Sequence, residues 1–117
     1  MLYYLHRMLK KANRLSRTQF SKYFRLGKRH HFEHLTIIYS PTPTFGCAVV
    51  VGKKVAKGAV RRNTLKRRLL ARIAQLQKES AVTGVFIIII KPSFNSLPRA
   101  AADEFFHKSI AALIQST

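Results

Sequence analysis

The feature that most constrains the fold of this chain is a run of six consecutive apolar residues, from Val85 to Ile90. A run without polar alternation is typical of a strand that is covered on both faces. It is much shorter than the roughly 18 residues that a membrane-spanning helix needs, so we expect no membrane span. The sequence therefore predicts a covered strand in a small sheet against which helices pack.

A capping motif predicts a helix near the start of the chain. Ser16 and Gln19 have the S-x-x-Q spacing of a capping box, in which each side chain bonds the backbone N–H of the other residue. Aromatic residues then recur at helical spacing, and Gly27 is of the type that commonly ends a helix in the left-handed conformation. We therefore expect a helix over residues 17–26.

The rest of the chain predicts two further strands and two further helices. Residues with β-branched and aromatic side chains predict strands over 35–39 and 47–51, antiparallel because their connection is short. Apolar residues spaced by three and four predict amphipathic helices over 59–78 and 97–114. This order of elements predicts an α+β fold, an α/β sandwich with helices packed on a small sheet.

The charge balance points to a polyanionic partner. The 117 residues include 22 Lys or Arg but only 4 Asp or Glu, which gives a formal net charge of +18. We interpret this length as a single domain over residues 1–117, with residues 1–12 as a candidate flexible basic extension. A charge of this size favours nucleic acid as the partner. A carboxylate-rich two-metal nuclease site is not expected, because the only acids are Glu33, Glu79, Asp103 and Glu104.

The single cysteine and the opening residues bear on the compartment. Cys47 cannot form an internal disulfide and lies in an apolar run, which predicts a buried thiol in a reducing environment. The opening residues lack the apolar core and cleavage site of a secretion signal, so we expect a cytoplasmic protein. A mitochondrial presequence stays open as an alternative, because the chain is basic and has no acid before Glu33.

One segment concentrates the positive charge. A helix built only for solubility mixes signs, because like charges four residues apart repel each other. The segment contains no acid, and we expect no internal acid to offset the repulsion. We therefore expect its cations to grip the phosphates of RNA or DNA. An anionic membrane, a calmodulin-like partner and a plain solvated face stay open as alternatives. The cations are Lys53, Lys54, Lys57, Arg61, Arg62, Lys66, Arg67, Arg68 and Arg72.

The stretch from Gly52 to Leu69 resembles the signature of the bacterial ribonuclease P protein component. That signature runs Lys-Lys-Val, a short loop, Ala-Val and then Arg-Asn-Arg-x-Lys-Arg. The resemblance extends over residues 13–115, and Val85 to Lys91 corresponds to the last strand of the family. The residues that match the final part of the signature position by position are Arg62, Asn63, Lys66 and Arg67.

Aromatic residues extend the resemblance, and one position departs from it. Phe20 and Phe24 resemble two phenylalanines of the family's first helix, and Tyr39 resembles the tyrosine that ends its first strand. Thr64 stands where the family usually has the second arginine of its motif. One RNA contact should therefore be missing here or be supplied by Arg61.

The resemblance implies both a fold and a function. The fold is a sandwich with a small mixed sheet, in which the basic helix joins two parallel strands by a left-handed crossover, against the usual right-handed rule. The function is to bind ribonuclease P RNA and the 5′ leader of precursor tRNA, while the RNA carries catalysis. No small-molecule substrate and no cofactor on the protein are implied, and Mg²⁺ is expected to reach the particle through the RNA.

The resemblance also implies two sets of site residues. Cations of the basic helix would dock on phosphates, with the preceding lysine pair as a second contact. Asn63 would either cap the helix or hydrogen-bond the RNA. The leader would lie between the first helix and the sheet and stack on aromatic rings, with plain core packing as the alternative for the two phenylalanines. The expected RNA-binding residues are Lys53, Lys54, Lys57, Arg61, Arg62, Asn63, Lys66, Arg67, Arg68 and Arg72, and the expected leader residues are Arg17, Phe20, Phe24 and Tyr39.

Two other functions stay open at the level of the sequence. One is a structural RNA-binding protein such as a ribosomal component, which composition alone does not separate from the first. The other is a nuclease that cuts without an RNA partner, which the shortage of acids disfavours. A zinc site is not expected either, because the spacing of the candidate ligands is unlike that of known sites; these are His30, His31, His34 and Cys47.

Overall fold

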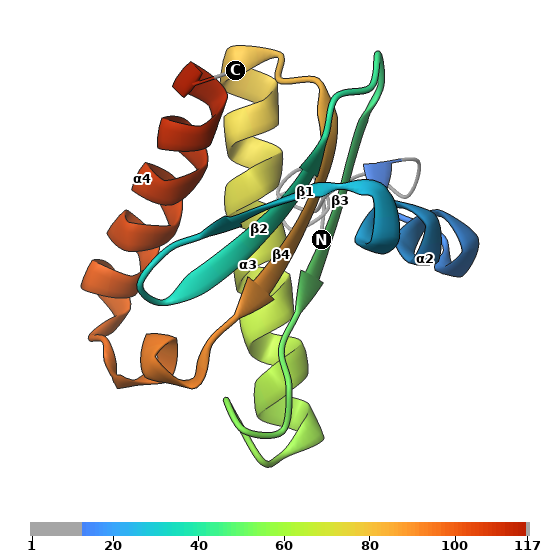
Figure 1. Ribbon diagram of the computed structural model, residues 1–117. Helices are drawn as coiled ribbons and strands as arrows, with labels where there is room; N and C mark the ends of the chain where they lie inside the picture. The colour runs from blue at the N-terminus through green and yellow to red at the C-terminus, as the bar shows by residue number, and fades with distance from the viewer. Residues whose placement is uncertain (1–12, 117) are drawn as a thin grey trace, which may run out of the picture.

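The computed structural model describes residues 13–116, and within this range the chain forms a four-stranded sheet with helices on both faces (Figure 1). The expected extension over residues 1–12 lies outside the described residues. In chain order the elements are α2 (Arg17–Leu26), β1 (Lys28–His31), β2 (Leu35–Ser40), β3 (Phe45–Val50), α3 (Ala59–Ser80), β4 (Gly84–Ile90), the 3-10 helix η2 (Pro92–Ser96) and α4 (Arg99–Ser116).

Helix α2 begins and ends at the predicted residues, but the conformation of Gly27 after it is not as predicted. The Gln19 N–H donates to Ser16 Oγ at 3.2 Å, and the Ser16 N–H donates to Gln19 Oε1 at 2.9 Å, which completes the capping box. Gly27 is extended, with φ −69° and ψ 155°, so the predicted left-handed conformation is wrong. Glycine is needed there because a Cβ atom would lie 2.5 Å from Ile38 Cγ2, where the end of α2 approaches β2.

The strands lie in the order β1-β2-β4-β3, which places β4 between β2 and β3. It pairs antiparallel with β2 and parallel with β3, and its residues are buried except for the half-buried Ile89. The predicted strand with both faces covered is therefore confirmed. Strands β2 and β3 run in opposite directions, as predicted from their short connection, but they are not neighbours because β4 separates them.

The connection from β3 through α3 to β4 is a left-handed crossover. In Figure 1 both strands point down the page, α3 passes behind the sheet, and β4 lies to the left of β3. This is the topology that the family resemblance implied.

Helices α3 and α4 cover one face of the sheet and form the main core with it. Alternate residues of β2 and β4 point into this core, among them Leu35, Ile37, Phe86 and Ile88. The apolar stripes predicted for the two helices are buried there, although Leu65 at the start of the first stripe is only partly buried. The buried stripe residues are Leu69, Ile73 and Leu76 of α3, and Phe106, Ile110 and Leu113 of α4.

Helix α2 lies against the other face of the sheet, away from α4 (Figure 1). The β2 side chains near its C-terminal end are Ile38 and Ser40, which alternate with the core residues of that strand. Helix α2 itself has no buried residue. It therefore leaves much of its own surface available on this side of the molecule.

Strand β1 and the 3-10 helix were not predicted from the sequence. The strand has the sequence Lys-Arg-His-His, without an apolar residue, and it pairs along β2 at the edge of the sheet. Charged residues are common on edge strands because they discourage pairing with another chain. The strand thus depends on its partner and not on its own propensity.

Candidate nucleic-acid interface

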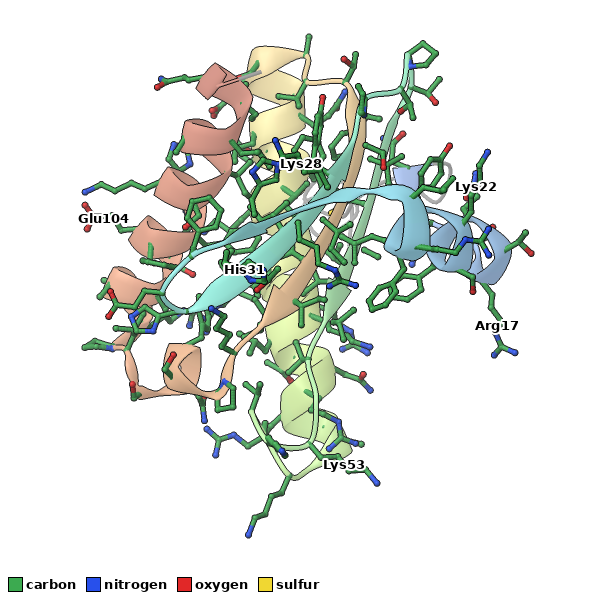
Figure 2. The ribbon with its side chains drawn as sticks, viewed as in Figure 1. Arg17, Lys22, Lys28, His31, Lys53 and Glu104 are labelled. Atoms are coloured by element: carbon green, nitrogen blue, oxygen red, sulfur yellow. The ribbon has the colours of Figure 1, made fainter. Side chains whose placement is uncertain are left out.

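The loop between β3 and α3 presents the first cations of the candidate interface. Val51 and Val55 are buried and anchor the loop, and the Val55 N–H donates to the Gly52 carbonyl at 3.1 Å. Asn95 of η2 donates from Nδ2 to the Val55 carbonyl at 3.1 Å. The loop is therefore held in place while it exposes Lys53, Lys54 and Lys57 (Figure 2 labels Lys53).

Arg62 holds this loop against the start of α3. Its Nη1 donates to the carbonyl of Ala56 at 3.0 Å and to that of Lys57 at 2.6 Å. The N-cap residue of the helix, Gly58, has no side chain that could make a capping hydrogen bond. Asn63 lies inside the helix beyond this cap and is exposed, so the alternative that it caps the helix is wrong.

Six of the expected RNA-binding cations have no side-chain partner among the described residues. In the described range 13–116, no hydrogen bond or ion pair engages these side chains, and all but the half-buried Lys66 are exposed. Their mutual repulsion is offset only by solvent and counter-ions, which a polyanion can replace. This set is called the cationic face below, and it consists of Lys53, Lys54, Lys57, Arg61, Lys66 and Arg67.

Arg68 and Arg72 differ from that set, because an acid of α4 lies between them. Asp103 Oδ1 is 3.4 Å from Arg68 Nε, and Asp103 Oδ2 is 3.0 Å from Arg72 Nη2. The Asp103 side chain is 11% exposed, that of Arg68 is 26% exposed and that of Arg72 is 54% exposed. The expectation that no internal acid offsets the positive charge is therefore wrong for these two arginines.

Thr64 leaves a gap in the row of cations on α3. Its hydroxyl donates to the Val60 carbonyl at 2.9 Å, within its own helix. Arg61 lies one turn earlier on the same side of α3 and is exposed. It is therefore the cation placed to supply the contact that Thr64 lacks.

Two of the three expected leader rings lie together on α2. The rings of Phe20 and Phe24 are stacked, with centroids 5.6 Å apart and an angle of 25° between their planes. Phe24 is 38% exposed, and the guanidinium of Arg29 lies 4.8 Å from the centre of its ring. Arg17 is exposed at the start of the same helix (Figure 2).

Tyr39 is not part of that cluster. Its ring lies 5.0 Å from the ring of Phe86 and covers Gly84, so it packs on the core side of the sheet with α3 and α4. Its neighbours Ile38 and Ser40 point to the α2 side instead. The structure thus separates Tyr39 from the two phenylalanines, and the expected cleft with three rings does not form.

Sequence reasoning missed Arg29, which the structure places on the α2 side. Arg29 pairs with Ile38 across the two strands, and paired residues point to the same face of a sheet. The alternation of β1 would have revealed this, but nothing in the sequence of β1 signals a strand. The cations and rings on this side are called the α2 face below; they are the exposed Arg17, Phe24 and Arg29 and the half-buried Phe20.

Two of the candidate zinc ligands, His31 and His34, hydrogen-bond to other side chains, and Cys47 is buried. Nδ1 of His31 is 3.1 Å from Thr36 Oγ1, and Nδ1 of His34 is 2.8 Å from Ser93 Oγ. Burial raises the pKa of the Cys47 thiol well above its ordinary value. No three His, Cys, Asp or Glu side chains within residues 13–116 gather into a group that could hold a metal ion.

None of the helices in the described part of the chain combines the length and the apolar composition that crossing a bilayer requires.

Comparison with known proteins gives one consistent family. A model of the ribonuclease P family matches residues 8–113. The ribonuclease P protein component of Microcystis aeruginosa is 42% identical over 84 residues, which cover 65% of this chain and 68% of that protein. The one from a Pseudanabaena species is 34% identical over 99 residues, which cover 77% of this chain and 85% of that protein.

The fold is also similar to that of a solved structure from this family. The Staphylococcus aureus RNase P protein superposes with a TM-score of 0.74 at 18% identity, over 89% of this chain and 98% of that one. At this identity the likeness shows the fold alone, and the fold agrees with the sequence match. The chain therefore belongs to the ribonuclease P protein family, as the RNA-binding protein component of the endoribonuclease that matures the 5′ end of tRNA.

Proposed function

We propose that the cationic face is the surface on which this protein docks onto ribonuclease P RNA. The observation that supports this most is that its six cations lie together on one held loop and the adjoining start of α3 without an internal partner among residues 13–116. Exposed cations of this kind release counter-ions when they meet phosphates, which drives binding. Asn63 is exposed among them and adds a neutral donor and acceptor.

Arg62, Arg68 and Arg72 contribute to the same surface while they hold the protein together. A guanidinium has five N–H donors, so it can keep one internal partner and still donate to a phosphate. Arg72 is the more exposed of the two arginines that contact Asp103. In this proposal residues 13–116 act as one RNA-binding unit.

The 5′ leader of precursor tRNA would lie along the α2 face. The partly exposed ring of Phe24 offers a surface for a base, and stacking contributes about 1–3 kcal/mol per base with little dependence on sequence. Arg17 and Arg29 lie beside the rings and can neutralise leader phosphates. Tyr39 takes no part, because it lies on the other face of the sheet.

Catalysis in this proposal is carried by the RNA, with Mg²⁺ bound through the RNA. The protein supplies cations that reduce repulsion between phosphates, so that metal ions and substrate bind more readily. The described residues offer no cluster of acids for a metal-dependent cut of their own. A buried, free Cys47 thiol fits a particle that works in the reducing cytoplasm.

The docking surface is tested by binding of the whole protein to ribonuclease P RNA across a range of salt concentrations. The double variant Lys54→Ala with Arg67→Ala removes two exposed side chains that bond no other described residue, so its fold should be unchanged. We expect the slope of log K against log salt to become shallower by about 0.7–0.9 for each phosphate that the variant no longer neutralises. A slope equal to that of the wild type would contradict the proposal.

The α2 face is tested by precursors that differ only in leader length. Phe24→Ala should weaken binding of a precursor with a long leader to the holoenzyme, and leave a precursor with a leader of one nucleotide unaffected. Leu26→Ala, which removes another exposed apolar side chain from the end of the same helix, is the matched control. Equal effects of Phe24→Ala on both precursors would show that the ring does not contact the leader.

A further inference from the structure

A groove runs between α3 and the segment formed by η2 and the start of α4, on the side of α3 that faces α4. Its first part is a hollow of about 320 Å³ between the start of α3 and η2, and a second part of about 440 Å³ continues along α3. The two parts share Arg68 and Arg99. The polar side chains that line this α3–α4 groove are Arg61, Thr64, Arg68, Arg72, Asn95 and Arg99, with Gln75 at the far end and Asp103 beside the second part.

The groove is strongly positive despite the acid beside it. It has four guanidinium groups and one carboxylate, and Asp103 is already paired with Arg68 and Arg72. The side chains of Arg61 and Arg99 make no hydrogen bond or ion pair within residues 13–116. The neighbouring acid Glu104 bonds Lys108 at 2.8 Å, so it does not neutralise the groove.

Both helices that border the groove have a cation in their first turn. Helix α4 begins with Arg99 and α3 has Arg61 and Arg62 in its first turn, and neither has an acid in that turn. Positive side chains at the positive end of a helix are unfavourable because the helix dipole repels them. An anion in the groove would remove this repulsion at both helix ends.

The walls of the groove are fixed before any partner binds. Phe94 of η2 is 1% exposed, and Asn95 donates from Nδ2 to the Val55 carbonyl in the loop before α3. On the other side, Asp103 holds Arg68 and Arg72 between the two helices. A rigid groove of this kind loses little conformational entropy when it binds an extended, regularly charged chain.

We propose that the α3–α4 groove is a second binding site for the phosphodiester backbone of ribonuclease P RNA, with Arg99 as its outermost contact. This inference rests on the proposed docking of the cationic face, because the groove lies along the other side of the same helix. Arg61, Arg68 and Arg72 contribute to both surfaces and make them continuous. The α2 face is on the opposite side of the sheet, so the groove belongs with the RNA that docks on α3 and not with the leader.

Two single-charge variants of the full-length protein separate the groove from a general charge effect. Arg99→Ala removes an exposed cation of the groove, and Lys28→Ala removes an exposed cation of β1 at the end away from the turn that contacts η2. We expect Arg99→Ala to weaken binding to ribonuclease P RNA several-fold and to reduce the salt slope by about 0.7–0.9. Lys28→Ala should change both quantities much less. Equal effects would overturn the groove as a site.

A tethered cleavage reagent shows which RNA enters the groove. Arg99→Cys gives an exposed thiol for attachment of iron-EDTA, whereas the native Cys47 is buried and stays unlabelled. Ala112→Cys, exposed further along α4, is the control position. We expect cuts in ribonuclease P RNA from position 99, unchanged when precursor tRNA is added, and none at those nucleotides from position 112. Cuts confined to precursor tRNA, or no cuts at all, would overturn the proposal.

The outcomes also separate the two proposals. If Arg67→Ala weakens binding to ribonuclease P RNA while Arg99→Ala has no effect, the cationic face stands and the groove fails. If the wild-type protein does not bind ribonuclease P RNA, both proposals fail together.

Discussion

Asp103 and Glu104 are neighbours on α4, and we predict that they contribute very differently to stability. Glu104 has the shorter contact, 2.8 Å to Lys108, against 3.4 Å from Asp103 to Arg68 and 3.0 Å to Arg72. Burial runs the other way, because the Glu104 side chain is 65% exposed and that of Asp103 is 11% exposed. The stability lost when an ion pair is broken depends mainly on whether a charge is left buried. We therefore expect burial, and not the length of the contact, to determine which of the two acids matters more for stability.

The magnitude for Asp103→Ala follows from what the substitution leaves behind. Arg68 Nε is buried, has no hydrogen-bond partner among the described residues, and would be deprived of the carboxylate beside it. The Arg68 guanidinium, 26% exposed, would lose the counter-charge of this ion pair. Breaking an ion pair costs about 3–5 kcal/mol when it is fully buried and about 0.2–1 kcal/mol when it is exposed, so the cost for this partly buried site lies between these limits. Alanine recovers about 0.5 kcal/mol as the better helix former. We expect the free energy of unfolding to fall by about 2 kcal/mol.

Urea denaturation of the two alanine variants beside the wild type measures this difference. Asp103→Ala should lower the midpoint without a change in the dependence of the free energy on urea. Glu104→Ala should be indistinguishable from the wild type within the error of the titration. Equal destabilisation by the two variants, or a larger effect of Glu104→Ala, would refute the reasoning that burial decides.

Three further predictions concern the end of α2, the loop before α3 and the exposed pair on α4. Gly27→Ala should destabilise the protein by about 1–3 kcal/mol in thermal unfolding, because its Cβ would clash with β2, whereas Gly52→Ala, with nothing within 4 Å, should not. Arg62→Ala should speed amide hydrogen exchange in the loop, since it removes two hydrogen bonds to loop carbonyls; unchanged exchange would contradict its holding role. The hydrogen bond from Lys108 and its charge lower the pKa of Glu104, so its small stabilising effect disappears as the pH falls through that pKa. Lys108→Ala should raise the pKa of Glu104 in an NMR titration, and an unmoved titration would contradict this cause.

Elements with strong local signals could be predicted from the sequence. The Ser16 and Gln19 pair set the start of α2, and the spacing of Leu69, Ile73 and Leu76 set the buried side of α3. Strand β4 could be predicted because a short run of consecutive apolar residues, most of them β-branched, is typical of a strand covered on both faces. In each case the residues that form the element also carry the signal.

Features that depend on distant partners could not be predicted. Strand β1 has no apolar residue and exists because β2 offers it hydrogen bonds. The left-handed crossover was implied by the family resemblance, but the position of β4 between β2 and β3 was predicted neither by the resemblance nor by the pattern of residues. The role of Gly27 likewise depends on Ile38, which lies on another element.

In the candidate site, too, features with a local sequence signal could be predicted and features that depend on distant residues could not. The run of cations on α3 and its preceding loop was visible in the sequence, but the acid that pairs with two of them comes from another helix. The face of Tyr39 was hidden because β2 has buried residues at odd and even positions alike, from Leu35 to Ile38. Without a polar alternation, a strand gives no sign of which face meets which helix.

The most direct test of the account is cleavage of a precursor tRNA with a long leader by ribonuclease P RNA at limiting Mg²⁺. The account predicts that the wild-type protein restores cleavage, that Lys54→Ala with Arg67→Ala restores it much less at moderate salt, and that the protein alone cuts nothing. Equal rescue by the wild type and this double variant would contradict the claim that the cationic face delivers the protein to a catalytic RNA, as would cleavage by the protein alone.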